Sequence, residues 1–323
     1  MKAAVHSRYG PPEVVTVAEV EKPAVGADDV LVKVHATTVN RTDCAYRAAK
    51  PFFMRALTGL TRPRRLVLGT EYAGVVEAVG GGVTSFGVGD RVFGYNEGEF
   101  GAHAEYLAVP QGGAIAAMPD AVTFEEAAPT TEGAHYALAF LRVARVRAGQ
   151  AVLVHGATGA IGSAAVQLLK HHGVTVTAVC DTARVELVKG LGADRVVDYT
   201  AQDFTEDEQR YDAVFDAIGK STFGRCRRLL KPGGLYLSSE LGPGWQNVLL
   251  PLVTPLFRGR KVKFPFPRQN QEIVRHIGEL IDAGGFRPVI DRRYPLERIA
   301  DAYRYVETGQ KTGGVVITVV SPN

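Results

Sequence analysis

The residues best suited to chemistry form a glycine-bearing turn, Gly156-Ala157-Thr158-Gly159-Ala160-Ile161-Gly162. The short apolar run Val152–His155 leads into this turn, and Ser163–His171 follows it with apolar residues at helical spacing. Val174–Cys180 is a second run rich in β-branched residues. Strand, glycine turn, helix and strand form a βαβ unit, and its turn is where the pyrophosphate of a dinucleotide binds. Cofactor contacts are therefore expected from Ala157, Thr158, Gly159, Ala160, Ile161 and Gly162.

The chemistry of such a turn comes from the backbone. The first N–H groups of a helix are unpaired and lie at the positive end of the helix dipole, so both effects attract phosphate. Gly159 would let the backbone approach the phosphates, and Gly162 would let the helix pack closely on the strand. Ala157 stands where the usual fingerprint has its first glycine, so the pattern is A-x-G-x-x-G, a weaker match than the full one.

Two charged side chains after the second strand bear on which dinucleotide binds. Asp181 follows that strand, where an acidic side chain bonds the ribose hydroxyls and repels a 2′-phosphate, favouring NAD. Arg184 could instead pair with a 2′-phosphate and favour NADPH. The strand expected over Ala213–Ala217 ends in Ile218 and Gly219, which are further cofactor-binding candidates.

The elements that must position these residues change character along the chain. Up to about residue 118, alternating runs separated by glycine turns predict a small barrel-like β-rich domain, and Asp29–Thr38 is its clearest strand. Asp43 could cap a helix over Cys44–Ala49. Between about 120 and 285, strands alternate with helices, which predicts an open parallel sheet. We expect residues 119–284 to form the dinucleotide-binding domain, inserted between residues 1–118 and 285–323, with the substrate in the cleft between the domains.

Composition limits the possible partners. The chain has 323 residues, 46% hydrophobic residues and a net charge of +3, which suits a two-domain globular protein and argues against nucleic-acid binding. No apolar run approaches the roughly 18 residues of a membrane span, and Met1–Val5 leads directly into a strand rather than a signal peptide. Cys44, Cys180 and Cys226 lie far apart, so they predict neither disulfides nor a metal knuckle and indicate the cytoplasm.

The order of the motifs resembles one family across nearly the whole chain. The sequence is similar to the medium-chain dehydrogenase/reductase superfamily and, within it, to the zinc-independent quinone oxidoreductase group. This resemblance implies an α/β fold, with a Rossmann-type doubly wound parallel sheet inserted into a β-rich GroES-like catalytic domain. The motifs that carry it are, besides the glycine turn, Gly69-Thr70-Glu71, Ala73–Gly80, Gly87–Val92, Leu191–Asp194 with Asp198-Tyr199, and Leu230–Gly234.

The resemblance also implies that no zinc is needed. The alcohol dehydrogenases of the superfamily hold a catalytic zinc with a Cys at the place of Asn40 and a His at the place of Thr70. Neither an amide nor a threonine hydroxyl is a good zinc ligand, because zinc prefers thiolate, imidazole or carboxylate. Three scattered cysteines cannot supply the four-cysteine lobe of those enzymes either.

Without a metal, the expected reaction is hydride transfer from a reduced nicotinamide to a small apolar quinone or α,β-unsaturated carbonyl. In the family, an Asn at the place of Asn40 and a Tyr five residues later line the site; here Ala45 holds that place and Tyr46 is one residue further on. We count Asn40 and Tyr46 as catalytic candidates. Tyr199 matches a family tyrosine that contacts the 2′-phosphate, so NADPH is favoured, with NADH possible. The four phenylalanines that could line an apolar substrate slot are Phe52, Phe53, Phe264 and Phe266, and the last two are also cofactor candidates.

Two other functions stay open at this point. The chain could reduce an enoyl thioester or another pathway intermediate, because substrate contacts lie in variable loops. It could also be a nucleotide-binding protein with a structural or sensing role and little turnover, which the shifted Tyr46 mildly favours. The habit of the family is to form dimers or tetramers, so a homodimer is expected, with no nucleic-acid or membrane partner.

Overall fold

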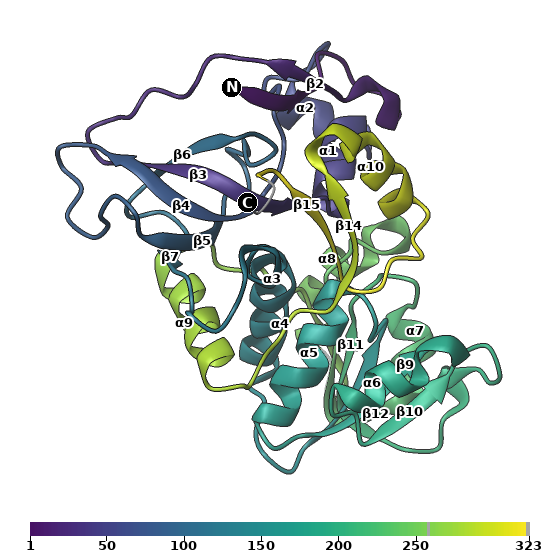
Figure 1. Ribbon diagram of the computed structural model, residues 1–323. Coiled ribbons are helices and arrows are strands. Elements are labelled where there is room, and N and C mark those ends of the chain that lie inside the picture. The colour runs from purple at the N-terminus through teal and green to yellow at the C-terminus, as the bar shows by residue number, and fades with distance from the viewer. Residues whose placement is uncertain (257–258, 321–323) are drawn as a thin grey trace. The chain divides into compact units, whose positions relative to one another are not determined.

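The computed structural model of the chain describes residues 1–256 and 259–320. The chain divides into two compact units (Figure 1). The first unit is Met1–Glu132 together with the chain from Gln269 onward, and the second is Gly133–Arg268. The second unit is therefore an insertion in the sequence of the first.

The first unit is built on a seven-stranded sheet whose main order is β14-β15-β3-β4-β5-β7, with β6 paired to β3. The longest strand, β3 (Asp29–Thr38), is antiparallel to β15, β4 and β6. Alternation along β3 places Val30, Val32 and Val34 in one buried cluster. The other strands of this unit are β1 Lys2–Val5, β2 Thr16–Glu19, β4 Glu71–Val79, β5 Arg91–Tyr95, β6 Tyr106–Pro110, β7 Ile115–Ala117, β14 Ile290–Pro295 and β15 Gly314–Thr318.

Helices cover parts of this sheet. The helix α9 packs against β7 and β5, and α3 packs against β3 and β4. These contacts place both helices in the first unit. The sequence patterns group them with the dinucleotide-binding domain, expected over residues 119–284. The helices of the first unit are α1 Arg41–Ala48, α2 Met54–Thr58, α3 Phe124–Ala127, α9 Gln271–Asp282 and α10 Ile299–Glu307, and α4 Thr131–Ala144 begins at the end of its first segment.

The second unit is a six-stranded sheet in the order β10-β9-β8-β11-β12-β13, and every neighbouring pair is parallel. The order reverses between β8 and β11, and the crevice outside the carboxyl ends of such strands is where open α/β sheets bind ligands. The strands are β8 Ala151–His155, β9 Thr175–Cys180, β10 Arg195–Asp198, β11 Tyr211–Asp216, β12 Leu230–Ser238 and β13 Lys261–Lys263.

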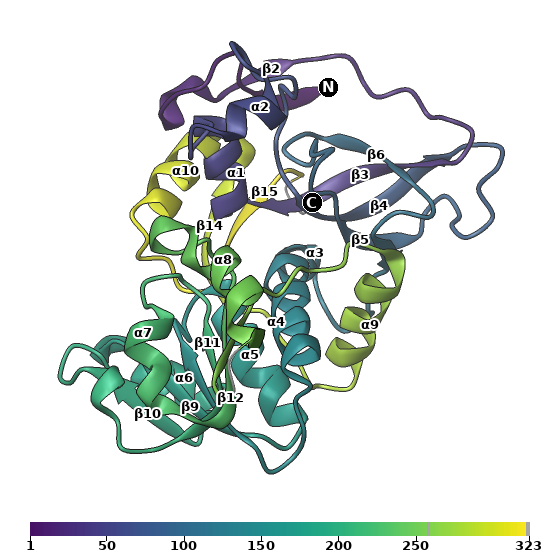
Figure 2. The ribbon, with the colours of Figure 1, turned by 180° about the vertical axis from the view of Figure 1, so that it is seen from behind.

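Helices flank this sheet, and α4 and α5 lie side by side on one face (Figure 1). The Phe140 ring of α4 stacks on the Phe215 ring of β11 at a centroid distance of 4.9 Å. The helix α8 packs against β13 and is visible in the view from behind (Figure 2). The helices are α5 Ala160–His171, α6 Val185–Gly190, α7 Phe223–Cys226 and α8 Gln246–Val253.

Short 3₁₀ turns join these elements. They are η1 Pro12–Val14, η2 Ala128–Thr130, η3 Thr182–Arg184, η4 Phe204–Glu206, η5 Arg227–Leu229, η6 Pro243–Trp245, η7 Thr254–Leu256 and η8 Leu296–Arg298. The predicted fold class is confirmed: a parallel Rossmann-type sheet is inserted into a β-rich unit.

One local prediction failed, and one helix was not foreseen. The first helix begins at Arg41 with Asn40 as its N-cap, so Asp43 lies one turn inside it and does not cap a helix over Cys44–Ala49. The connector over residues 50–65 contains α2, which the sequence did not indicate.

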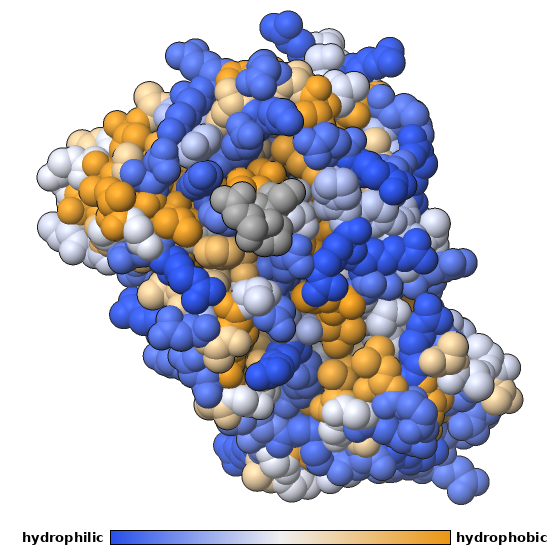
Figure 3. Space-filling view, viewed as in Figure 1, coloured by the Kyte–Doolittle hydropathy of each residue, from blue (hydrophilic) through white to orange (hydrophobic). Residues whose placement is uncertain are grey.

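The surface is mostly hydrophilic on the face shown in Figure 3, and hydrophobic residues gather there over the strand-rich part of the first unit. No helix within residues 1–256 and 259–320 is both long and apolar enough to cross a membrane.

Candidate functional site

The glycine turn of the second unit requires glycine at two of its positions. It follows β8 directly, and Gly156 has a positive φ of 81° that favours glycine. A Cβ on Gly162 would lie 2.1 Å from the carbonyl oxygen of Gly156, so only glycine lets α5 pack this closely on the turn. The N-cap of α5 is Gly159, which has no side chain to cap the first N–H groups of the helix. The backbone of the turn thus fits a pyrophosphate group.

Around this turn, the predicted residues differ in exposure. Ala157 is fully buried beside β8, whereas residues 158 to 161 are partly exposed. Ile218 lies against the turn, because a Cβ on Gly156 would meet its Cγ2 at 2.5 Å. Gly219 is next along the chain, with a positive φ of 65°. The ends of β8 and β11 therefore meet at the place where the strand order reverses.

A buried carboxylate holds the β11 side of this site. Asp216, the last residue of β11, is fully buried and accepts hydrogen bonds from Gly219 N at 3.0 Å and Ser221 N at 3.1 Å. It also bonds His155 Nδ1 at 2.9 Å and the Tyr236 hydroxyl at 2.8 Å. Burial acts to raise the pKa of Asp216, but these bonds outweigh it and the pKa is lowered. Asp216 is therefore an ionised anchor for the loop after β11, and sequence patterns did not single it out.

The end of β9 carries the two side chains expected to select the cofactor. Arg184 Nη1 donates to Asp181 Oδ2 at 2.8 Å, so the two predicted residues form an ion pair. The other oxygen, Asp181 Oδ1, is buried and has no hydrogen-bond partner among the residues that the structure describes. A buried carboxylate oxygen without a donor fits a ribose hydroxyl. Tyr199 follows β10 and lies beside the end of β9, because its backbone N–H donates to Cys180 O at 3.0 Å. Its side chain is half-exposed.

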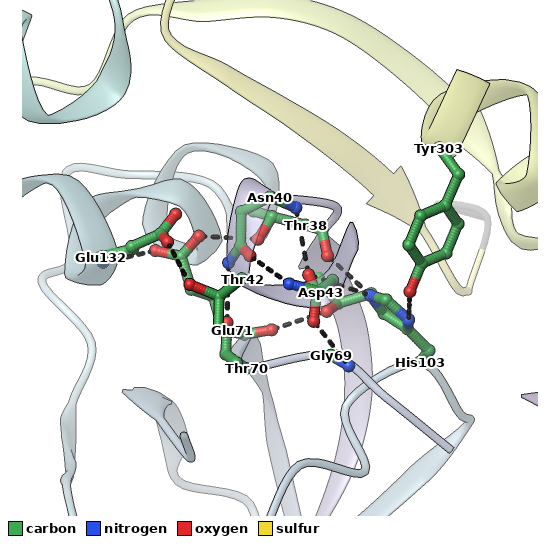
Figure 4. A network of polar contacts seen from close by, with 11 residues as sticks. Thr38, Asn40, Thr42, Asp43, Gly69, Thr70, Glu71, His103, Glu132 and Tyr303 are labelled. Carbon is green, nitrogen blue, oxygen red and sulfur yellow. Dashed lines mark hydrogen bonds and ion pairs between the residues drawn. The ribbon is translucent and has the colours of Figure 1, made fainter. Parts of the chain in front are cut away.

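In the first unit, Asn40 and Thr70 are bonded to each other (Figure 4). Asn40 Nδ2 donates to Thr70 Oγ1 at 2.7 Å. Asn40 also forms a capping box with Asp43: its Oδ1 accepts from Asp43 N at 2.9 Å, and its own N–H donates to Asp43 Oδ2 at 3.0 Å. The Asn40 side chain is thus fixed by hydrogen bonds at both its oxygen and its nitrogen (Figure 4).

Asp43 ties this turn to the rest of the sheet. Its Oδ1 accepts from Gly69 N at 3.1 Å, and His103 Nε2 lies 3.8 Å from Oδ2. Burial raises the pKa of Asp43 to about 8 and lowers that of His103 to about 4. His103 Nε2 contacts Thr38 O at 2.7 Å, and the Tyr303 hydroxyl lies 3.4 Å from its Nδ1. A neutral imidazole that donates from Nε2 and accepts at Nδ1 satisfies both contacts.

Tyr46 belongs to a different environment. Its ring packs on Phe100 at a centroid distance of 4.5 Å, and it lines a cavity of about 170 Å³. Burial raises the pKa of the Tyr46 hydroxyl. The residues that line this cavity do not include Asn40; they are His6, Tyr46, Thr58, Pro63, Arg64, Arg65, Leu68, Gly98 and Phe100.

The four predicted phenylalanines fall into two pairs. Phe52 and Phe53 belong to the first unit and are 78% and 40% exposed. Phe264 and Phe266 follow β13 in the second unit, with ring centroids 4.9 Å apart, and the Phe266 side chain is exposed. Arg142 Nη2 donates to Phe266 O at 2.8 Å and fixes that segment on α4.

Comparison with known proteins decides the family. A family model described as "Alcohol dehydrogenase GroES-like domain" matches residues 26–120, and one described as "Zinc-binding dehydrogenase" matches residues 191–317. The chain is 32% identical over 332 residues to "2-methylene-furan-3-one reductase" of Solanum lycopersicum, covering 98% of this chain and 79% of the relative. It is equally similar, with the same coverage, to "NADPH-dependent alkenal/one oxidoreductase, chloroplastic" of Arabidopsis thaliana.

The chain belongs to the medium-chain dehydrogenase/reductase superfamily. Its relatives there are the quinone and alkenal oxidoreductases, which are NAD(P)H-dependent. The solved "quinone oxidoreductase from Coxiella burnetii" has a TM-score of 0.89 with 26% identity, covering 99% of both chains. This similarity extends over both units, so the resemblance inferred from the motifs is confirmed.

The residues of this superfamily member do not fit a catalytic zinc at the usual place. Asn40 and Thr70 stand in the ligand positions and bond each other through an amide N–H and a hydroxyl oxygen. Within the described part of the chain, no group of three or more His, Cys, Asp and Glu side chains is placed to hold a metal ion. The Asn40 amide and the Thr70 hydroxyl are neutral and weak zinc ligands. The description "Zinc-binding dehydrogenase" of the family model therefore does not carry over to this site.

Proposed function

We propose that this protein is a zinc-independent, NADPH-preferring reductase that acts on quinones and α,β-unsaturated carbonyl compounds. The relatives with full-length similarity are named as alkenal/one and furanone reductases, and a structural neighbour as a quinone oxidoreductase. A reduced nicotinamide supplies a hydride in such reactions. The glycine turn fits the pyrophosphate of this cofactor, and the orphaned Asp181 Oδ1 fits its ribose.

The observation that carries the proposal is the hydrogen bond from Asn40 Nδ2 to Thr70 Oγ1. This bond orients the amide, and the family resemblance puts Asn40 and Thr70 at the places of two zinc ligands, which supports a metal-free role for the amide donor. An amide nitrogen carries two N–H groups, so Nδ2 can make one more bond besides the one to Thr70. We infer that this second N–H binds the substrate oxygen as negative charge develops on it.

The cofactor preference rests on the ion pair between Arg184 and Asp181. Asp181 alone would repel a 2′-phosphate, but Arg184 at 2.8 Å compensates its charge and can bond the phosphate itself. Tyr199 is half-exposed, as a residue that contacts the same phosphate must be. These features support NADPH as the preferred cofactor, with NADH also accepted.

We also propose that the protein works in the cytoplasm as a homodimer, without nucleic-acid or membrane partners. All three cysteines, which are described, are free thiols, as suits a reducing compartment. A row of exposed apolar side chains near α8 supports self-association, and a monomeric mass by light scattering would contradict it. The row consists of Trp245, Leu249, Leu252, Val253 and Leu256.

The proposed role of Asn40 is tested by two variants. Asn40→Ala removes both the amide donor and the helix cap, whereas Asn40→Ser keeps a capping oxygen. Loss of one donor to a developing oxyanion costs on the order of 10²-fold in kcat, and about 10-fold where other donors remain. We expect kcat with 1,4-naphthoquinone or a small enone to fall by that amount in both variants, with NADPH affinity unchanged.

Tyr46→Phe serves as the comparison, because Tyr46 lines a cavity to which Asn40 does not belong. We expect a smaller loss of kcat from this variant. If Tyr46→Phe abolishes turnover while both Asn40 variants retain it, the assignment of the two residues is wrong. If the wild-type protein binds NADPH but reduces no quinone or enone, the proposed reaction is wrong.

A further inference from the structure

The Tyr46 cavity, the space of about 170 Å³ in the first unit whose lining includes Tyr46, has no role in the reaction proposed above. A cavity of about 150 Å³ is large enough for a ring of the size of benzene, so this one has room for a small organic group. Part of its wall is apolar or aromatic, and part is polar. The apolar and aromatic residues are Tyr46, Pro63, Leu68 and Phe100, and the polar ones are His6, Thr58, Arg64 and Arg65.

The connector that forms one wall of this cavity is strongly basic. Residues 50–66 contain five basic residues and neither Asp nor Glu, whereas the whole chain has a net charge of only +3. The five are Lys50, Arg55, Arg62, Arg64 and Arg65. A run of like charges on a connector is usually a solvated surface. Arg64 and Arg65 differ from the other three because they line the cavity.

The two arginines of the cavity differ in their partners. Arg65 forms an ion pair with Glu99, which balances its charge. The Arg64 side chain forms no hydrogen bond or ion pair within residues 1–256 and 259–320. Its backbone is nevertheless held in place, because Arg64 N donates to Thr58 O at 2.8 Å. The cavity therefore has one positive charge that no described residue compensates.

Two other polar residues of the cavity are already bonded within the fold. The Thr58 hydroxyl donates to Met54 O at 3.0 Å and also bonds the Tyr9 hydroxyl at 2.7 Å. His6 Nδ1 donates to Leu66 O at 2.9 Å, so its Nε2 keeps the lone pair of a neutral imidazole. Burial lowers the pKa of His6, so this imidazole adds no positive charge at neutral pH. The positive charge of the cavity therefore comes from Arg64.

The Tyr46 hydroxyl is a further donor in the cavity. It has no hydrogen-bond partner among the described residues. Burial and then the charge of Glu97 raise its pKa, so it keeps its hydrogen at neutral pH. Glu97 is itself bonded, because its Oε2 accepts from the Tyr95 hydroxyl at 2.8 Å and from Gln269 Nε2 at 2.6 Å. Tyr46 and Arg64 thus supply an O–H donor and a cation, which is the chemistry that binds a carboxylate.

The cavity shares two chain segments with the turn that holds Asn40. Tyr46 lies on α1, and Asn40 is the N-cap of that helix, six residues earlier. With a rise of about 1.5 Å per residue, this separation is about 9 Å along the helix axis. Leu68 lines the cavity, and Thr70, two residues further on, bonds Asn40. A group several bonds away from a carbonyl oxygen held by Asn40 is therefore within reach of the cavity.

We propose that the Tyr46 cavity binds the carboxylate of an acidic substrate, with Arg64 as the residue that determines this specificity and Tyr46 as a second donor. This inference rests on the proposed function and narrows its substrates to quinones and enones that carry one carboxylate. One unpaired arginine matches one negative charge, whereas a phosphate monoester carries up to two. Leu68 and Phe100 would contact the apolar part of the substrate between its two polar ends.

The first test compares an acid with its ester. The acid 6-oxooct-7-enoate is an enone with a carboxylate at the other end of its chain, and its methyl ester has the same enone without the charge. One hydrogen bond to a charged group strengthens binding by about 10-fold. We therefore expect the wild-type KM for the acid to be about 10-fold lower than the KM for the ester. Equal KM values overturn the proposal.

Two arginine variants locate the charge that recognises the acid. Arg64→Gln should bring the ratio of the two KM values close to one. Arg62→Gln is the matched control, because Arg62 is an exposed residue of the same connector that does not line the cavity, and this variant should keep the wild-type ratio. Both variants lose one positive charge. A wild-type ratio in Arg64→Gln, or an equal change of the ratio in both variants, overturns the proposal.

Tyr46→Phe tests the second donor. This variant keeps the ring that packs on Phe100 but removes the hydroxyl. We expect the preference for the acid to become weaker, though less than in Arg64→Gln, because a neutral donor binds a carboxylate less strongly than a cation does. A purely structural defect would change the KM values of acid and ester alike and leave their ratio unchanged. An unchanged ratio in Tyr46→Phe shows that Tyr46 does not bind the carboxylate and contradicts its part in the proposal.

A binding measurement separates failure of this inference from failure of the proposed function. The saturated acid 6-oxooctanoate lacks the C=C bond, so its binding is measured by calorimetry without turnover. We expect its Kd to be about 10-fold higher for Arg64→Gln than for the wild type and for Arg62→Gln. If the wild type does not bind this acid, or binds it no better than Arg64→Gln does, the inference fails. If binding depends on Arg64 but the wild type reduces neither the enones nor 1,4-naphthoquinone, the proposed function fails instead.

Discussion

Two buried aspartates, one in each unit, show how differently the two halves of this protein build their sites. Asp216 in the second unit is surrounded by donors from the loop after β11 and from two side chains, which lower its pKa despite burial. Asp43 in the first unit accepts two backbone N–H bonds, and burial raises its pKa to about 8. One is an ionised anchor for a backbone loop, and the other belongs to a network of buried side chains.

We attribute the difference to the ligands proposed for the two units. A pyrophosphate is recognised by backbone N–H groups, so the second unit needs a turn of fixed shape and little specific side-chain chemistry. In the proposed reaction, side chains recognise the substrate oxygen in the first unit, where Asn40, Thr42 and Glu132 bring polar groups to the start of α1. We therefore predict that substitutions which disturb the backbone impair binding by the second unit most. Substitutions which change the charge of a side chain should impair the first unit most.

The largest effect is expected at Gly162. In Gly162→Ala the new Cβ would lie 2.1 Å from Gly156 O, and neither backbone can move without opening the turn. Overpacking of this kind costs about 3 kcal/mol, so NADPH affinity should fall by about 10²-fold. Gly190→Ala in the same unit is the control, because a Cβ at Gly190 meets nothing within 4 Å. Equal NADPH affinity in both variants by fluorescence titration would refute a backbone-built cofactor site.

A smaller effect is expected where side chains do matter in the second unit. Asp181→Ser removes a negative charge near the expected 2′-phosphate and should strengthen NADPH binding relative to NADH by roughly 1–2 kcal/mol. Arg184→Ala should do the reverse, because it also leaves Asp181 without its partner at 2.8 Å. Titration of both cofactors measures the ratio. An unchanged ratio in both variants would show that other residues select the cofactor.

The pH dependence of stability should come from the first unit. Asp43 binds its proton more tightly in the folded state, so its contribution to the free energy of unfolding falls as pH rises from about 4 to 8. His103, with a pKa of about 4, is neutral in the fold and makes the opposite contribution below pH 6.5. Asp216 has a lowered pKa, so its contribution is lost only in acid.

Between pH 6.5 and 8, only carboxyl groups with raised pKa values are therefore expected to change the free energy of unfolding. Each proton contributes a slope of up to about 1.4 kcal/mol per pH unit. Urea unfolding at several pH values measures this slope. Asp43→Asn should make it shallower, whereas an identical slope in wild type and variant would show that Asp43 is ionised throughout this range.

Sequence patterns predicted the second unit better than the first because its site is local. The strand, turn and helix around Gly156 to Gly162 are contiguous, and their hydrophobic period identifies them. Asn40 was identified through its register, but its role as N-cap was not, since Asp43 is an equally good capping residue. The ion pair of Asp181 and Arg184 was foreseen only as two competing residues. The cofactor contacts themselves and the domain boundaries remain predictions.

The remaining features depend on pairings that no local pattern reveals. Glu132 and Thr42 are 90 residues apart in sequence, and their contact joins the first turn of α1 to the first turn of α4. Helix α8 follows a Gly-Pro-Gly segment and contains Pro251, so its sequence is typical of a loop. Strand β13 has three residues and was too short to show a period. Lys231 to Gly234 have turn composition, yet they continue strand β12.

The most direct test of the whole account is turnover of the protein after removal of metal. Purified protein would be treated with a chelator, its metal content measured, and its NADPH-dependent reduction of 1,4-naphthoquinone compared with that of untreated protein. Since Asn40 and Thr70 bond each other at the usual ligand places, we predict far less than one zinc per chain and equal activity before and after treatment. About one zinc per chain, with activity lost to the chelator and restored by zinc, would contradict the account.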